Sequence, residues 1–234
     1  MTFLEKIAKA KKIISDYYNS YAGLNCAVAC SFGKDSMVVL DIALQVDPNF
    51  QVFSIMTPFK PKETLQYKAR MEQAWKLNIK TYQQKLNPLH IRPEDIPYYA
   101  VDPDGCCNYY KVEPTREAIK DMQLEVWITG LRRTEGRTRT DYDYEEHKGG
   151  LIKLNPILDF TETDVWRYLA INNIPVNELY KRGYRSLGCE PCSTPEKDEW
   201  ETERAGRWKG TSKCGGECGL HTKDLTEGVN EVLC

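Results

Sequence analysis

The sequence predicts an α/β protein with a doubly wound, mostly parallel sheet of five or six strands and a C-terminal tail. Short apolar stretches alternate with longer amphipathic ones, and this alternation is typical of βαβ units. The 234 residues, of which 41% are hydrophobic, suffice for one compact domain with a core of ordinary size. No internal repeat or low-complexity run interrupts the pattern. One domain followed by a tail is therefore the expected organisation.

Each element is predicted from the spacing and length of its apolar stretch. Apolar side chains recur at helical spacing between Phe3 and Tyr18, which predicts a helix over 3–18. The stretch CAVACS (26–31) is short and apolar, as expected for a buried strand. The helix expected at 161–173 begins with Thr161 and Asp164, which have the spacing of a capping box. Further strands are expected at 51–56, 79–83, 125–130 and 151–157, and further helices at 36–45, 62–77 and 113–122.

Beyond about residue 182 the periodicity gives way to glycine, proline, cysteine and charged residues. We therefore expect a domain over 1–181 and a tail over 182–234 that folds over it. The formal net charge of −2 gives no reason to expect a nucleic acid or a membrane as partner. No stretch approaches the roughly 18 apolar residues of a membrane span. The beginning, MTFLEKIAKAKK, lacks the apolar run of a signal peptide, so we expect a cytoplasmic protein.

Two loops at the carboxyl ends of predicted strands are candidates for a binding site. In an open parallel sheet the ligand lies beyond these ends, at the point where the strand order reverses. SFGKDS (31–36) follows the first strand, and TGLRRTEGRTRT (129–140) follows the fourth. A strand order of 3-2-1-4-5 would bring both loops to one crevice.

The composition of the first loop suits a phosphate group. Gly33 allows close approach of the backbone, Ser31 and Ser36 offer hydroxyls, and the next helix begins with unpaired N–H groups. The loop is not a Walker A motif, because the Gly-x-x-x-x-Gly-Lys frame is absent. An ordinary strand-to-helix turn is the alternative.

The second loop is rich in arginine. Its arginines are Arg132, Arg133, Arg137 and Arg139. Guanidinium groups match phosphate and sulfate oxygens in a bidentate manner, so the loop suits a dianionic mixed anhydride. A solvated loop is the alternative.

Nine cysteines, in a chain without an export signal, favour metal or redox roles over disulfide bonds. Cys26 and Cys30 lie on one face of the first strand, where packing as small hydrophobic residues explains them. Four others form two local pairs that suffice to ligate one metal centre: Cys106, Cys107, Cys189 and Cys192. Adjacent cysteines are awkward for a zinc ribbon, so an iron–sulfur cluster is favoured over zinc.

Cys218 lies in the glycine-rich, cationic stretch GRWKGTSKCGGECGLHTK (206–223). A thiol on such a mobile segment can enter a crevice, attack, and leave again toward a second protein. The alternatives are a frayed tail or a small zinc knuckle formed by Cys214, Cys218 and His221.

The first loop resembles the SGGKDS-type loop of ATP pyrophosphatases and their relatives. Over nearly its whole length, the chain resembles the assimilatory adenylyl-sulfate (APS) and phosphoadenylyl-sulfate (PAPS) reductases. The resemblance is densest from LNPILDFTETDVWRYL (154–169) through GCEPCS (188–193) and ERAGRW (203–208) to ECGLH (217–221). It implies an adenine nucleotide alpha hydrolase-like, PP-loop type fold, with a nucleotide-binding domain over 1–181. It also implies a cluster-binding loop and a mobile tail over 182–234.

The resemblance also implies roles for individual residues. Cys218 matches the nucleophile of the family. CCNYYKVEP (106–114) and GCEPC (188–192) are similar to the branch with a [4Fe-4S] cluster, which implies Cys106, Cys107, Cys189 and Cys192 as its ligands. Lys111 matches a lysine between cluster and substrate, and Arg204 and Arg207 match arginines that hold phosphate and sulfate. The candidate catalytic residues are Cys218, Lys111 and His221. The candidate substrate-binding residues are Ser31, Phe32, Gly33, Lys34, Asp35, Ser36, Thr57, Arg132, Arg133, Arg139, Arg204 and Arg207.

The implied reaction has two stages. The Cys218 thiolate attacks the sulfur of APS and expels AMP, which leaves an S-sulfocysteine. Thioredoxin, or glutaredoxin as a similar dithiol protein, then releases sulfite. Cationic groups must offset the charge as an anionic nucleophile approaches an anionic sulfonate. PAPS is the alternative substrate, and a homo-oligomer is a further expectation.

Three departures from the family keep alternatives open. Lys34, Asp35 and Ser36 replace the usual triplet, which keeps an ATP-pyrophosphatase-type iron–sulfur enzyme, such as a tRNA thiolase, as a second hypothesis. MTPF (56–59) replaces Asp-Thr-Gly and keeps only Thr57. Cys214 precedes ECGLH where the family generally has no cysteine, so we expect a resolving thiol there. A non-catalytic redox sensor is a third hypothesis.

Overall fold

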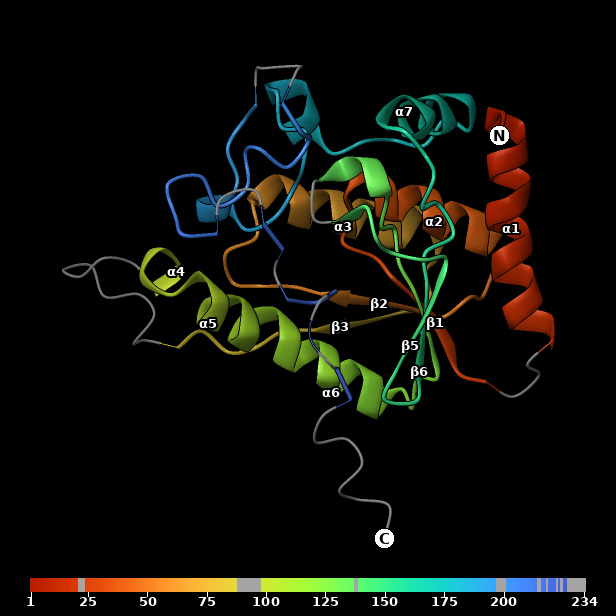
Figure 1. Ribbon diagram of the computed structural model, residues 1–234, viewed down its shortest axis with the longest axis horizontal. Coiled ribbons are helices and arrows are strands. Elements are labelled where there is room, and N and C mark those ends of the chain that lie inside the picture. Colours follow the sequence, from red (N-terminus) through yellow and green to blue (C-terminus); the bar gives the residue numbers. More distant parts are fainter. Residues whose placement is uncertain are drawn as a thin grey trace, which may run out of the picture.

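The computed structural model describes residues 1–20, 24–87, 98–136, 139–196, 201–213, 216–217, 219–221, 223 and 225–226. Six strands form one sheet in the order β3-β2-β1-β4-β6-β5 (Figure 1). Their bounds are β1 Cys26–Ala29, β2 Val52–Ile55, β3 Ile79–Tyr82, β4 Val126–Ile128, β5 Glu145–Lys148 and β6 Leu151–Leu154. Neighbouring strands are parallel throughout, except that β5 runs antiparallel to β6. The predicted mostly parallel sheet is confirmed.

Helices cover both faces of this sheet (Figure 1). The helices are α1 Phe3–Ser20, α2 Lys34–Leu44, α3 Lys62–Trp75, α4 Tyr98–Val101, α5 Pro103–Cys107, a π-helix Asn108–Val112, α6 Glu113–Asp121 and α7 Glu162–Ile171. Three 3₁₀ turns span Arg133–Glu135, Glu178–Arg182 and Glu190–Cys192. One core cluster joins α1, α2, α3 and α7 to the sheet, and a second joins α6 to the opposite face. The fold is therefore doubly wound, as predicted.

Every strand and helix predicted from the sequence is present, within a few residues at each end. The predicted capping box is confirmed, because Thr161 Oγ1 accepts from the Asp164 N–H, and Asp164 accepts from the Thr161 N–H. The antiparallel strand β5 was not predicted. Its sequence, Glu-Glu-His-Lys, is charged and mostly exposed, so it has no apolar pattern. The short helix α5 was also missed, because five residues are too few to show a period.

Close packing at Gly130 brings the end of β4 to the start of α2. A Cβ atom on Gly130 would lie 2.9 Å from the Ser36 nitrogen and 3.0 Å from the Asp35 carbonyl carbon. Because both are backbone atoms, only glycine allows this approach. The two loops expected to share one crevice therefore meet at that point.

The described part of the segment after residue 182 packs over the carboxyl edge of the sheet. Ser193 pairs with Arg207 in an isolated antiparallel bridge, and the Trp208 N–H donates to the Cys192 carbonyl at 3.0 Å. Trp208 is the largest fully buried side chain in the described part of the protein. None of the described helices combines the length and the apolar character that a membrane crossing requires.

Candidate active site

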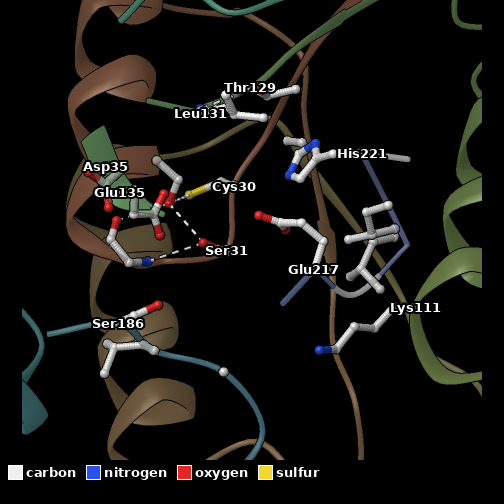
Figure 2. Close-up of a pocket in the computed structure, with 18 of the residues that line it drawn as sticks. Cys30, Ser31, Asp35, Lys111, Thr129, Leu131, Glu135, Ser186, Glu217 and His221 are labelled. Carbon is white, nitrogen blue, oxygen red and sulfur yellow. Dashed lines mark hydrogen bonds between the residues drawn. The ribbon is translucent and has the colours of Figure 1, made fainter. Parts of the chain in front are cut away.

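A cavity of about 200 Å³ lies at the carboxyl edge of β1 and β4. The strand order changes direction at this point, as expected for the binding crevice of an open parallel sheet. Figure 2 shows Ser31 and Asp35 on one side of the cavity, and Lys111, Glu217 and His221 on the other. Segments far apart in the sequence therefore face a single cavity.

The turn after β1 presents its small polar residues to this cavity. Ser31, Gly33 and Ser36 line it, and the Ser36 hydroxyl donates to the Gly33 carbonyl at 2.9 Å. Phe32 has a left-handed backbone (φ 60°), and its side chain is fully buried in the core. Phe32 therefore does not line the cavity, contrary to the expectation for a substrate-binding residue. The left-handed turn directs the aromatic ring inward and leaves the serines and the glycine at the surface of the cavity.

Lys34 and Arg132 do not line the cavity either, because a buried carboxylate holds both. Lys34 Nζ lies 2.8 Å from Glu203 Oε2 and donates to the Arg185 carbonyl at 2.7 Å. Arg132 donates to Glu203 Oε2 and to Asp35 Oδ1, both at 2.5 Å. Burial alone would lower the pKa of Lys34, but Asp35 and Glu203 outweigh it and raise that pKa. These two cations, expected to bind substrate, instead cross-link the turn after β1 to ERAGRW (203–208).

The other arginines after β4 lie in different places. Arg133 does not line the cavity, because it pairs with Asp159 and donates to the Tyr142 carbonyl at 2.9 Å. Arg137 lies outside the described residues. Arg139 lines the cavity, as expected. Of the arginines predicted in this loop, Arg139 alone among the described ones is placed to contact an anion in the cavity.

Arg139 and Arg204 form a buried cluster with two carboxylates. Arg139 donates to Glu217 through Nε at 2.5 Å and Nη2 at 3.0 Å, and its Nη1 pairs with Glu135. Arg204 lies 3.4 Å from Glu217 Oε2 and 3.6 Å from Glu135 Oε1. Burial would raise the pKa of Glu217, but the hydrogen bond from Arg139 and the charges of both arginines hold it at about 2. Glu217, the residue before Cys218, is thus an ionised anchor for the tail.

His221 lines the same cavity. Its ring stacks on Trp127, with centroids 5.8 Å apart and planes 15° apart. Nδ1 is buried without a hydrogen-bond partner among the described residues. Burial, Lys153 and Arg139 lower the pKa of His221 well below its ordinary value, although Glu217 opposes them. The imidazole is therefore neutral at pH 7 and can accept or donate a hydrogen bond.

Lys111 and Arg207 line the same cavity. Together with three further cations they form its cationic wall, which consists of Lys60, Lys111, Arg139, Arg204 and Arg207. Lys111 belongs to the π-helix Asn108–Val112, which continues α5 into α6, and such widened turns are frequent at functional sites. Arg207 donates to the Leu187 carbonyl at 2.9 Å and to the Cys192 carbonyl at 3.3 Å. Both cations are therefore placed by structure next to the cysteines.

A second, smaller cavity adjoins the first. The four predicted cluster ligands line it: Cys106, Cys107, Cys189 and Cys192. All four are buried, and Lys111 and Trp208 line both cavities. Thr57 Oγ1 lies 3.2 Å from Cys189 Sγ. Thr57, expected to bind substrate, therefore contacts a cysteine and does not line the larger cavity.

The chemistry of these thiols fits a cationic group between them. Burial, together with the neighbouring thiols, raises the pKa of Cys106 to about 12 and that of Cys192 to about 11. For Cys189, Lys111 and Lys60 outweigh burial and lower the pKa. No three cysteine, histidine or carboxylate side chains in the described part of the chain are arranged to hold a single metal ion. Four buried thiols that line one cavity are the donor set of a [4Fe-4S] cluster, the group that the sequence resemblance implies.

Sequence reasoning missed the uncharged and acidic members of the site. Glu135, Tyr180 and Trp208 line the larger cavity, Glu217 neutralises Arg139 there, and Glu203 holds Arg132 and Lys34 away from it. A signal was present, since Glu203 precedes Arg204, Glu217 precedes Cys218, and Glu135 lies two residues from Arg133 and from Arg137. Nothing in the sequence indicates which cation each carboxylate meets.

Cys218 and Cys214 lie outside the described residues. Glu217 and Leu220, described neighbours of Cys218, both line the larger cavity. The predicted nucleophile is therefore flanked by residues that reach the cavity where the predicted cations lie.

The fold and the cavity place this protein in a structural class, the mostly parallel α/β proteins with a cation-rich pocket where the strand order reverses. Residues 25–195 match the phosphoadenosine phosphosulfate reductase domain, and the chain belongs to this family. It is 35% identical over 228 residues to an adenosine 5'-phosphosulfate reductase of Oceanobacillus iheyensis, covering 92% of this chain and 89% of the relative. It is 36% identical over 201 residues to an enzyme of the same name from Neisseria meningitidis, covering 82% and 81%.

Among solved structures, the fold resembles a phosphoadenylyl-sulfate reductase from Candida auris in a phosphate complex. The TM-score is 0.65 at 20% identity, and the match covers 80% of this chain and 90% of that one. This likeness supports the fold alone.

Proposed function

We propose that this protein reduces APS to sulfite and AMP, and that Cys218 is its nucleophile. One observation carries the proposal: Glu217 and His221, on either side of Cys218, line the same cavity as Arg139, Arg204 and the turn after β1. The relatives named adenosine 5'-phosphosulfate reductase support the choice of APS.

In the first step, the Cys218 thiolate attacks the sulfur of APS. The new S–S bond forms as the bond from sulfur to the phosphate oxygen breaks, and AMP leaves with that electron pair. Lys111, Arg204 and Arg207 reduce the repulsion between thiolate and sulfonate. The neutral His221 offers its buried Nδ1 as a hydrogen-bonding group beside the reacting atoms.

In the second step, a dithiol protein of the thioredoxin or glutaredoxin class reduces the S-sulfocysteine. One of its thiols attacks the Cys218 sulfur and displaces sulfite, and its second thiol then releases Cys218 by forming a disulfide. Such a partner requires a reducing compartment, which is consistent with the proposed cytoplasmic location.

Cys106, Cys107, Cys189 and Cys192 would hold a [4Fe-4S] cluster. When bound, the cluster would add a local electrostatic field and clamp together two distant parts of the chain. Cys189 precedes the turn Glu190–Cys192 and Cys192 ends it, and the Glu190 N–H donates to the Phe59 carbonyl at 2.8 Å. These contacts hold Cys189 and Cys192 close together, which supports their proposed role as a ligand pair.

The alternative of an ATP pyrophosphatase rests mainly on GKDS (33–36). Lys34 pairs with Glu203, donates to the Arg185 carbonyl and does not line the cavity, which argues against a role in binding phosphate. Sulfite release tests the proposal against this alternative and against a redox sensor. Purified protein with APS and dithiothreitol or thioredoxin should produce sulfite, and PAPS should react more slowly. An absence of sulfite with both substrates would refute the proposal.

Cys214 is proposed as a resolving thiol. In place of direct attack by the dithiol protein, its thiolate would attack the sulfur of the Cys218 S-sulfo adduct, displace sulfite and leave a Cys214–Cys218 disulfide. The dithiol protein would then reduce this disulfide. In a single turnover without added reductant, the wild type should therefore release sulfite, whereas C214S should retain the adduct. Sulfite is quantified and the adduct is detected by mass spectrometry. C234S should behave like the wild type, and sulfite release by C214S under these conditions would rule out the role.

Gly188→Ala should impair catalysis by displacing Arg207. A Cβ atom on Gly188 would lie 2.1 Å from Arg207 Nη2 and 2.4 Å from Cζ. The guanidinium can move aside, but it then loses its bonds to the Leu187 and Cys192 carbonyls. We expect kcat/KM for APS to fall about 10- to 100-fold, because that decrease corresponds to the loss of one or two charge-assisted hydrogen bonds. Circular dichroism should remain unchanged.

A double-mutant cycle checks this cause. If G188A acts through Arg207, then G188A/R207A should be no slower than R207A. Additive losses would show that the alanine disturbs something else.

A further inference from the structure

Trp208 separates the two cavities and lines both of them. Its side chain is only 1% exposed, and its indole N–H is buried without a partner among the described residues. Its backbone is left-handed (φ 50°), which is rare for a bulky residue and costs free energy. The fold therefore holds an aromatic ring at this point in spite of unfavourable local geometry.

Four cations surround this ring. Lys111 Nζ lies 5.5 Å from the ring centroid and Lys213 Nζ lies 5.6 Å from it. The guanidinium carbons of Arg204 and Arg207 lie 5.5 Å and 4.5 Å from it. All four distances are within the roughly 6 Å over which an indole attracts a cation. The cations come from the π-helix, from ERAGRW (203–208) and from the segment just before Cys214.

Carboxylates account for only part of this gathering of like charge. Arg204 is near Glu135 and Glu217, and Lys213 pairs with Asp104. Arg207, the closest cation, donates only to carbonyls, and no carboxylate of the described residues lies within ion-pair distance of it. Because the ring is buried, the attraction between its negative face and these charges is weakly screened.

We propose that Trp208 is a positioning residue that holds these four cations together between the cysteines and the substrate cavity. The proposal rests on the proposed function in one respect: Lys111, Arg204 and Arg207, the three of these cations that line the larger cavity, receive the phosphate–sulfonate group of APS. Trp208 acts through the cations and not by contact with the reacting sulfur. Its ring offsets part of their repulsion, and at Arg207 it does so where no described carboxylate neutralises the charge.

The first test needs no substrate. W208L keeps an apolar side chain but lacks the π face, and W208F keeps a weaker one. W127L is the matched control, because Trp127 is also buried and also lines the larger cavity, and none of the described lysines or arginines lies over its ring. The thermal midpoint Tm of each holoprotein is measured in about 0.05 M and about 0.5 M NaCl. This increase in salt shortens the electrostatic screening length about threefold.

In W208L the repulsion is no longer offset, so added salt should stabilise it. We expect its Tm to rise with salt by about 2–4 °C more than that of the wild type or W127L. W208F should lie between W208L and the wild type. Equal salt responses of W208L and W127L would overturn the proposal. If W208L does not accumulate, W208F and W127F are compared by the same criterion.

The second test uses APS. Without the indole ring the cations around it should move apart and bind the APS anion more weakly. KM should therefore rise about tenfold in W208L and about threefold in W208F, with kcat changed much less. A fall in kcat at unchanged KM would indicate a merely structural role and contradict the proposal. If the wild type forms no sulfite from APS, the proposed function fails, whereas the salt response still decides the role of Trp208.

Discussion

Replacing Cys218 by serine should lower sulfite production from APS by about 10³-fold or more. A cysteine thiol ionises within about two pH units of neutrality, whereas a serine hydroxyl stays protonated and is a far weaker nucleophile. No sulfonate adduct should form on C218S, as judged by the mass of the intact protein. The binding of AMP should be retained, because the cations and the turn after β1 that surround the cavity are unchanged.

C234S is the matched control, since it removes a thiol from the same tail and should keep the wild-type rate. The neighbours of Cys218 should stay in place in C218S, so the loss of activity should be due to the missing sulfur atom alone. Arg139 holds Glu217 through two hydrogen bonds, and Trp127 holds the ring of His221 by stacking. Sulfite formation by C218S at the wild-type rate would eliminate the proposed mechanism.

The centre of the sheet could be predicted well because its parallel strands β2, β1 and β4 are buried on both faces and form continuous apolar runs. The burial of Val28, Val52 and Val126 illustrates this. The strand β5 lacks that signal, because it lies at the edge of the sheet and pairs only with β6. Its pairing is set by its position next to β6, which is a property of the folded chain.

The site was predicted less completely, for an electrostatic reason. A sequence shows which residues carry charge, but the fold decides which charges neutralise each other. Lys34 and Arg132 were expected to face an anion, and both instead meet Glu203, which is distant from them in the sequence. Arg139 and Arg207 carry the same charge and do line the cavity. Nothing local in GLRRTEGRTR (130–139) distinguishes these outcomes.

The two cysteine pairs, unlike the charged residues, could be predicted from their spacing in the sequence alone. Cys106 and Cys107 end one helix, and Cys189 precedes and Cys192 ends one 3₁₀ turn, so each pair is local. Tertiary structure had only to bring two pairs together. It places them around one cavity, beside Trp208.

Replacing Cys192 by serine should remove bound iron and enzymatic activity together. Three remaining thiols are too few for a cluster with four cysteine ligands. Cys192 is also linked to the cationic wall, because its carbonyl accepts hydrogen bonds from the Trp208 N–H and from Arg207 Nε. Loosening this segment should displace Arg207, so we expect sulfite production to fall about 100-fold or more. Iron content, visible absorbance and sulfite production are measured on the same preparation.

C26S is the matched control for loss of a buried thiol. Burial raises the pKa of Cys26 to about 11, as it does for Cys192, but Cys26 lies in β1 and lines neither cavity. C26S should therefore keep its iron and its activity, apart from a modest loss of stability. Full turnover by an iron-free C192S would show that catalysis does not require the cluster. In that case the cysteine cavity would stabilise the fold, and the cations around Trp208 would suffice to receive the substrate.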